Sequence, residues 1–346
     1  HLFRMACSRL PSGLVCWDAE LQHLDWVASA MQRQISGACG IACILDFIVP
    51  EFLAFELPRR SIAAGSRHTC VVKPDGMLVC FGDNRFGQCD VPPDLGPVVA
   101  IAAGGFHTCA VKADGTLVCF GANGCGQCKV PKDLGPVVSV TAGGDHTCAV
   151  KGDGTVVIFG IQGTVPCMVP PELGPVAAAA AGTYHICALK PDGTLACFGS
   201  NGKGQCEVEA DLGPVIAVSA GAFHTAAVKA DGSLVCYGDD GHGQCTAPPD
   251  LGPVLDVAAA NLHTYAVKAD GYLACFGTSG QPIPEKLGRV QAVAAGRDHT
   301  CVVTASGRLV CFGLNDRGQC NVPPDLGPIY AGCDQRTFPL KKAVRT

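Results

Sequence analysis

The chain has 346 residues, of which 48% are hydrophobic and only 16% are charged, so its composition excludes an intrinsically disordered protein. Its formal charge of −5, with no basic block beyond Lys341, Lys342 and Arg345, gives no electrostatic basis for nucleic-acid binding. The 23 cysteines are an odd number and cannot all pair within one chain. This favours an intracellular reducing compartment, the cytoplasm or nucleus, or an organelle if a targeting segment has been removed.

Residues 1–57 contain no repeat and are predicted to form a partly helical N-terminal extension. Asp18 is a candidate N-cap, and apolar residues at helical spacing predict a helix to about Gln34. Residues 38–49 are apolar but too short for a membrane span, which needs about 20 residues. They are expected to be a buried or docking segment. If the chain contacts a membrane, residues 38–55 are expected to make that contact.

Residues 58–329 repeat one unit seven times, and residues 330–346 are predicted to be a C-terminal tail. In the second copy a small extended segment, Val98–Gly104, precedes two β-type runs, His107–Lys112 and Thr116–Gly121, and a short fourth strand, Cys128–Pro131. Asp114-Gly115 between the two runs is a strong hairpin signal. The repeated His-Thr-Cys-Ala-Val-Lys-like string begins at His68, His107, His146, His185, His224, His263 and His299, at intervals of 39, 39, 39, 39, 39 and 36 residues.

Seven such units predict an all-β fold, a closed seven-bladed β-propeller of four-stranded antiparallel blades. Both faces of each unit are apolar, as stacking between two neighbouring blades requires. A closed ring removes exposed strand edges, which favours a propeller over an open β solenoid. Pro and Gly interrupt every copy and exclude a helical solenoid. The sixth copy is shorter and lacks the Gly-Gln-Cys step, which predicts one irregular outer loop.

The string Ala-Ala-Gly-x-x-His-Thr-x-Ala-Val-Lys-x-Asp-Gly-x-Leu-x-x-Phe-Gly-x-Asn-x-x-Gly-Gln resembles the repeat of the regulator-of-chromosome-condensation family. The resemblance implies a seven-bladed propeller. The compact unit is most similar to the short-repeat branch, which includes a secreted bacterial β-lactamase inhibitor, and its cysteines resemble those of repeat proteins from some protists. The family's guanine-nucleotide exchange and chromatin-binding roles belong to loops and a basic tail that this sequence does not match.

The recurring histidines and cysteines are interpreted as architecture. A catalytic group needs to occur once, and equivalent positions in packed sheets lie about 10 Å apart, too far to share a zinc ion. Each histidine is therefore expected to hydrogen-bond a neighbouring backbone group. A cross-strand disulfide such as Cys109–Cys119 fits the hairpin, but Ile158, Ala226 and Tyr265 each replace one partner while the other remains. The cysteines are thus predicted to be small core residues and not obligatory pairs.

No catalytic, cofactor-binding or metal-binding residue is predicted, and the protein is not expected to be an enzyme. Cys125-Gly-Gln-Cys128 is a lone pair without a second pair or a βαβ context, so it does not predict a redox or zinc site. No glycine-rich phosphate loop precedes a helix, and no nucleophile and base stand out as a set.

Function is expected on the face of the ring that varies between copies. Antiparallel connectivity places the Gly-x-x-His and x-Asn-x-x-Gly-Gln turns on this face, and the Lys-x-Asp-Gly hairpin and Pro-x-Asp-Leu-Gly-Pro linker on the other. Phe106, Tyr184, Phe223 and Leu262 are expected to converge on one rim, because exposed aromatic clusters anchor partners. The predicted partner-binding residues are Arg67, Phe86, Phe106, Asp145, Tyr184, Lys203, Phe223, His242, Leu262, Asp298 and Arg317.

The leading hypothesis is a non-enzymatic protein-protein interaction module or scaffold that binds a protein partner through this face. One alternative, suggested by the resemblance, is a guanine-nucleotide exchange or regulatory factor for a small GTPase. Another is a structural subunit of a larger assembly, docked through the N-terminal extension.

Overall fold

The computed structural model describes residues 6–9, 15–18, 61–160, 168–278 and 282–329. The chain divides into two units, His1–Glu56 and Leu57–Thr346. In the first unit, β1 (Ala6–Arg9) pairs antiparallel with β2 (Val15–Asp18). The predicted helix after Asp18, the apolar segment 38–55 and the C-terminal tail lie outside the described residues. Within the described ranges, no helix is long and apolar enough to cross a membrane.

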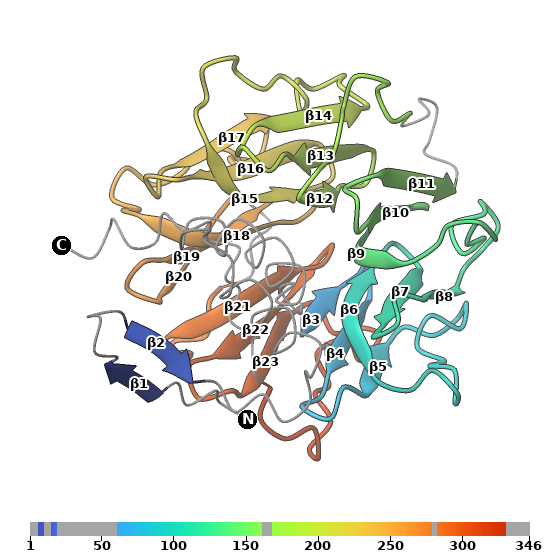
Figure 1. Ribbon diagram of the computed structural model, residues 1–346. Helices are drawn as coiled ribbons and strands as arrows, with labels where there is room; N and C mark the ends of the chain where they lie inside the picture. The colour runs from blue at the N-terminus through green and yellow to red at the C-terminus, as the bar shows by residue number, and fades with distance from the viewer. Residues whose placement is uncertain (1–5, 10–14, 19–60, 161–167, 279–281, 330–346) are drawn as a thin grey trace. The chain divides into compact units, whose positions relative to one another are not determined.

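The described part of the second unit consists of seven three-stranded antiparallel sheets that follow one another in chain order (Figure 1). Each sheet runs from an inner strand through a central strand, which starts at or just after the recurring histidine, to an outer strand. The strands are β3 (Ile62–Ala64), β4 (His68–Val72), β5 (Leu78–Gly82), β6 (Val98–Ala103), β7 (His107–Lys112), β8 (Leu117–Gly121), β9 (Val137–Ala142), β10 (His146–Lys151), β11 (Val156–Gly160), β12 (Ala178–Ala181), β13 (His185–Leu189), β14 (Leu195–Gly199), β15 (Val215–Ala220), β16 (His224–Lys229), β17 (Leu234–Gly238), β18 (Val254–Ala259), β19 (Thr264–Lys268), β20 (Leu273–Phe276), β21 (Val290–Ala295), β22 (His299–Thr304) and β23 (Leu309–Gly313).

The Asp-Gly hairpin joins the central and outer strands as predicted. In the second blade, the backbone N of Thr116 donates to Asp114 Oδ1 at 2.8 Å. Gly115 has a φ of 82°, which glycine adopts without a steric clash. The backbone N of Val137 donates to Gly115 O at 2.8 Å, so the linker to the third blade lies on the same face as the hairpin.

The described blades have three strands instead of the predicted four. After β8 the backbone closes tight turns on itself, in which Lys129 N donates to Gly126 O and Val130 N donates to Cys128 O, each at 3.0 Å. Pro131 has no N–H for a ladder. Because these polar groups are satisfied locally, the segment does not pair with β8, which remains the outer edge of the sheet.

The core lies between neighbouring sheets. Val111 from β7 and Leu134 from the linker pack with Val137 from β9, and similar clusters fill the other boundaries between blades. Each linker leucine is therefore an anchor that ties one blade to the next.

The seventh blade closes the ring on the first. Ile329, which follows the last linker, lies in the same buried cluster as Ile62 of β3. Thr69 Oγ1 in the first blade lies 3.0 Å from His299 Nε2 in the seventh. The same type of contact joins consecutive blades elsewhere, so the seven sheets form a closed propeller, as predicted.

Candidate partner-binding face

The surface that we call the variable face consists of the turn before the recurring histidine in each blade and, where the structure describes it, the turn after the outer strand. In the second blade, Gln127 Oε1 accepts a hydrogen bond from Cys125 N, and Asn123 Oδ1 accepts one from Cys128 N, both at 3.0 Å. Equivalent bonds form in the first, fourth, fifth and seventh blades. The turns are thus held rigidly while the intervening side chains vary. The recurrence of Gly-Gln in these five copies was the sequence signal for this role.

Beneath the variable face, recurring histidines contact threonines of the next blade. His107 Nε2 lies 3.0 Å from Thr147 Oγ1, and Thr147 Oγ1 donates to the backbone carbonyl of Gln127 at 2.8 Å. The hydroxyl has a single proton, so His107 donates to it through Nε2–H. The predicted direct bond to a backbone group is therefore replaced by a bond through a threonine. The other pairs are His68 with Thr108, His185 with Thr225, His224 with Thr264 and His299 with Thr69.

His146 departs from this pattern because the fourth blade has Ile186 in place of the threonine. Neither ring nitrogen of the fully buried His146 has a hydrogen-bond partner among the described residues. Burial, assisted by the neighbouring His107 and His185, lowers the pKa of His146 to about 4. The ring is therefore neutral at pH 7.

The cysteines occupy three environments in a blade. The first, such as Cys109, is fully buried on the central strand, and the second, such as Cys119, faces it from the outer strand. The third, such as Cys128, donates its thiol to Ala122 O at 3.3 Å. Burial, followed by the charge of Cys109, raises the pKa of Cys128 to about 12, which keeps it a donor. No disulfide joins any two of the 17 cysteines in residues 61–160, 168–278 and 282–329. Over these same ranges, no group of three His, Cys, Asp or Glu side chains is placed to hold a metal ion.

The eleven predicted partner-binding residues all lie in turns of the variable face, and several of them contact other residues of that face. Five of them make the following polar side-chain contacts: Arg67 with Asp316 at 2.6 Å, Lys203 with Asp239 at 3.2 Å, Asp298 with Arg297 at 3.5 Å, Asp145 with Gln127 Nε2 at 3.3 Å, and His242 Nδ1 with Thr278 Oγ1 at 3.0 Å.

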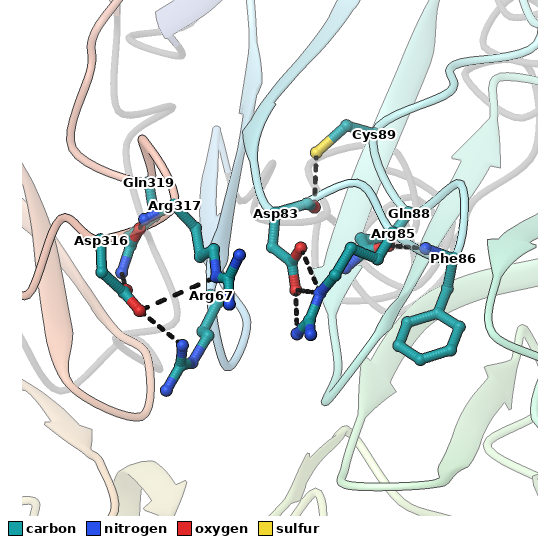
Figure 2. A network of polar contacts seen from close by, with 9 residues as sticks. All are labelled: Arg67, Asp83, Arg85, Phe86, Gln88, Cys89, Asp316, Arg317 and Gln319. Atoms are coloured by element: carbon teal, nitrogen blue, oxygen red, sulfur yellow. Dashed lines mark hydrogen bonds and ion pairs between the residues drawn. The ribbon is translucent and has the colours of Figure 1, made fainter.

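A charged cluster spans the boundary between the seventh and first blades (Figure 2). Asp83, which is almost fully buried, accepts hydrogen bonds from Nε and Nη2 of Arg85, both at 2.9 Å. These hydrogen bonds lower the pKa of Asp83 although burial opposes the shift. Asp316 binds Arg67 and lies 3.8 Å from Arg317. Each of these arginines is therefore paired with a neighbouring carboxylate.

The aromatic residues of the variable face form two pairs. The ring centroids of Phe86 and Phe106 lie 5.3 Å apart, and those of Tyr184 and Phe223 lie 5.0 Å apart. Phe86 is 53% exposed and Tyr184 is 38% exposed. The third blade, between the two pairs in blade order, carries the exposed Asp145. The single rim expected from the sequence is thus divided into two aromatic patches.

A cavity of about 380 Å³ opens at the ring axis on the variable face, with Tyr184, Phe223 and Arg297 among its lining residues. Most of the other lining residues are Gly, Ala or Ser, and neighbouring turns approach one another closely there. Gly105 N donates to Gly143 O at 3.0 Å.

A sequence model of the Regulator of chromosome condensation (RCC1) repeat matches six segments of the chain. The matched residues, about half of the sequence, are 60–88, 98–127, 137–163, 176–205, 215–244 and 290–319. The chain belongs to this family. The RCC1 repeat that is not matched is the sixth, in which Ala260 stands where the other copies have an axial glycine. A search of the curated proteins finds no match.

Solved structures share the RCC1-type propeller fold at low sequence identity. The CRINKLY WD40 ectodomain of the receptor kinase ACR4 from Arabidopsis thaliana is 23% identical, with 73% of this chain and 97% of that chain covered and a TM-score of 0.62. Yeast RCC1 (Prp20), solved with Kap60, is 16% identical, with 80% and 84% covered and a TM-score of 0.61. Human WBSCR16 is 18% identical, with 70% and 85% covered and a TM-score of 0.59.

Proposed function

We propose that this RCC1-repeat propeller is a non-enzymatic interaction module that binds a protein partner through its variable face. The observation that carries the proposal is the exposure of Phe86 and Tyr184, each packed against a second aromatic ring. Both lie in turns that are fixed by the propeller, so little conformational freedom is lost when a partner covers them. Aromatic residues on such a surface are favoured interface anchors.

The axial cavity supports the same proposal. Tyr184 and Phe223 line it, so an apolar anchor lies beside a recess that can receive a partner side chain. Arg297, from the seventh blade, adds a positive charge to the lining of the same cavity. We therefore expect the partner to present an apolar side chain together with a carboxylate.

The proposal is tested with a variant that removes both exposed rings, Phe86→Ala with Tyr184→Ala. Tagged protein is used to recover partners from cells of the source organism, and these are quantified by mass spectrometry. Tyr272→Ala is the matched control, because Tyr272 is an exposed aromatic residue in a hairpin on the opposite face. We expect the double variant to lose the partner set that the wild type and the control recover. Equal recovery by all three proteins would refute the proposal.

Regulation of a small GTPase is the second candidate, and membership of the RCC1-repeat family favours it. Prp20p of Saccharomyces cerevisiae, at 16% identity, has a structure described together with its binding properties to Gsp1p and histones. The test is the release of a fluorescent nucleotide from a panel of small GTPases. Acceleration that the Phe86→Ala, Tyr184→Ala variant abolishes would support this candidate. If nucleotide release is not accelerated for any GTPase of the panel, this candidate is refuted and the interaction module remains as the proposed function.

A further inference from the structure

The first, second, fourth and seventh blades each hold two cysteines that face one another across the hairpin. In the second blade, Cys119 Sγ on β8 donates to Cys109 Sγ on β7 at 3.0 Å. The equivalent contacts are Cys80 with Cys70 at 3.2 Å and Cys311 with Cys301 at 2.7 Å, while Cys197 lies opposite Cys187 in the fourth blade.

The strand register places these cysteines where a disulfide fits. Lys112 N donates to Thr116 O at 2.9 Å, so hydrogen-bonded pairs alternate along the hairpin from that position. Cys109 therefore faces Cys119 at a non-hydrogen-bonded position. At such positions the Cα atoms lie about 4.5 Å apart, within the range of about 4.4–6.8 Å that disulfides span. An S–S bond can thus form without separating the strands.

The two thiols of a pair differ in access and acidity. Cys109 is fully buried, whereas Cys119 is partly exposed on the outer edge strand. Burial raises the pKa of Cys109, but the hydrogen bond from Cys119, together with the neighbouring His107, outweighs it and lowers the pKa. The hydrogen bond to Cys109, followed by burial, raises the pKa of Cys119. The outer thiol meets an oxidant first, and the inner thiol is the better thiolate.

We propose that these four pairs are redox modification sites that interconvert between a dithiol and a cross-strand disulfide. The oxidant is a low-molecular-weight disulfide. The outer thiol passes its proton to the inner thiolate, to which it is hydrogen-bonded, and attacks one of the oxidant's sulfurs. This forms a mixed disulfide and releases a small thiolate, which takes up that proton from the inner thiol. The inner thiolate then attacks the outer sulfur, forms the S–S bond and releases a second small thiolate, which takes up a proton from water. Two protein thiols are oxidised and one small disulfide is reduced.

The third and sixth blades are internal controls. Cys148 faces Ile158, and Cys275 faces Tyr265, so neither blade has a cross-strand thiol pair. If oxidation followed exposure alone, Cys275, which is partly exposed, would react as readily as Cys119.

The experiment treats the reduced, folded full chain with oxidised glutathione, blocks the remaining thiols with an alkylating agent and digests with trypsin. Lys112 and Arg308 lie between the paired cysteines of the second and seventh blades and are not followed by proline, so each disulfide there links two peptides. Lys73 and Lys190 precede proline, so each of the other two pairs stays within one peptide, which when oxidised lacks the two alkyl groups that the reduced peptide carries.

We expect linked peptides for Cys109–Cys119 and Cys301–Cys311, and we expect dithiothreitol to separate them. Cys148 and Cys275 are expected to carry the alkyl group instead. Cys119→Ala is expected to remove the link in the second blade and to keep the link in the seventh. Full alkylation of Cys109 and Cys119 in protein that retains its β circular dichroism would overturn the proposal. So would glutathione that stays attached to Cys119 without a link to Cys109.

Discussion

His107 Nε2 and Thr147 Oγ1 lie 3.0 Å apart across the boundary between the second and third blades, and both residues are fully buried. The same contact crosses five of the seven boundaries in the described ring, including the one that closes it. Thr147 also holds the carbonyl of Gln127, which belongs to a turn of the variable face. One threonine therefore links the stability of the ring to the position of the proposed binding surface.

Thr147→Val is expected to destabilise the protein strongly. The change keeps the shape of the side chain but leaves His107 Nε2–H and the Gln127 carbonyl buried without their partner. Each buried polar group left unpaired costs about 1–3 kcal/mol, so with two such groups we expect the free energy of unfolding to fall by about 2–6 kcal/mol. Urea unfolding at pH 7 measures this free energy. Thr116→Val, in an exposed hairpin, is the control and should change the value by less than about 0.5 kcal/mol. Equal effects would contradict the role of the His–Thr contact.

Buried histidines should make the protein less stable in weak acid. In the folded chain burial, followed by neighbouring histidines, lowers the pKa of His146 and of His224 to about 4, whereas an unfolded histidine has a pKa of about 6.5. Between these values the unfolded chain binds more protons than the folded chain, so the free energy of unfolding falls as the pH falls. At pH 5 each of the two histidines should cost about 2 kcal/mol relative to pH 7.

Urea unfolding at pH 7 and pH 5 tests this pH dependence. His146→Gln keeps a neutral polar side chain at every pH, so it should reduce the difference between the two conditions by about 2 kcal/mol. The same free energy of unfolding at both pH values in the wild type would show that the buried histidines do not titrate as described.

Local signals in the sequence predicted much of this fold, and contacts between blades account for most of what they missed. Asp114-Gly115 predicts its hairpin because the turn geometry depends on these two residues alone. The partner of His107 could not be predicted from one repeat, since Thr147 lies forty residues away and meets it only after the blades stack. The fourth strand differs for a local reason, because Pro131 and the turns before it satisfy the backbone without a ladder.

In the candidate site, too, the local features were predicted from the sequence and the contacts between blades were not. The sequence assigned Phe106 and Tyr184 to one face, and the structure places both in turns of that face. It did not predict that Phe86 packs on Phe106 or that Arg67 binds Asp316, because both contacts join different blades. Variation between copies therefore located the surface, whereas the pairing of its side chains required the ring.

Gly104→Ala tests the close approach of the turns at the axis. A Cβ at this position would overlap His107 Cε1 and lie 2.6 Å from Gly143 O, so neighbouring blades would have to move apart. We expect a loss of about 1–3 kcal/mol in the free energy of unfolding, as for other overpacked sites. Gly124→Ala is the matched control, because nothing lies within 4 Å of a Cβ there. Thermal unfolding of both variants measures the difference. A Gly104→Ala protein as stable as the control would mean that the axis is less tightly packed than described.

Ile158→Cys should create a redox pair in the third blade, which lacks one. Ile158 lies directly opposite Cys148, in the register that Cys119 and Cys109 have in the second blade. The variant treated with oxidised glutathione should therefore gain a cross-link to Cys148, seen after trypsin as two linked peptides because Lys151 lies between the two positions. Under reducing conditions the smaller side chain should lower the free energy of unfolding by about 1 kcal/mol, and the cross-link should restore part of that loss by restricting the unfolded chain. If the variant folds and no linked peptide forms while the second and seventh blades oxidise, strand register alone does not determine which thiols pair.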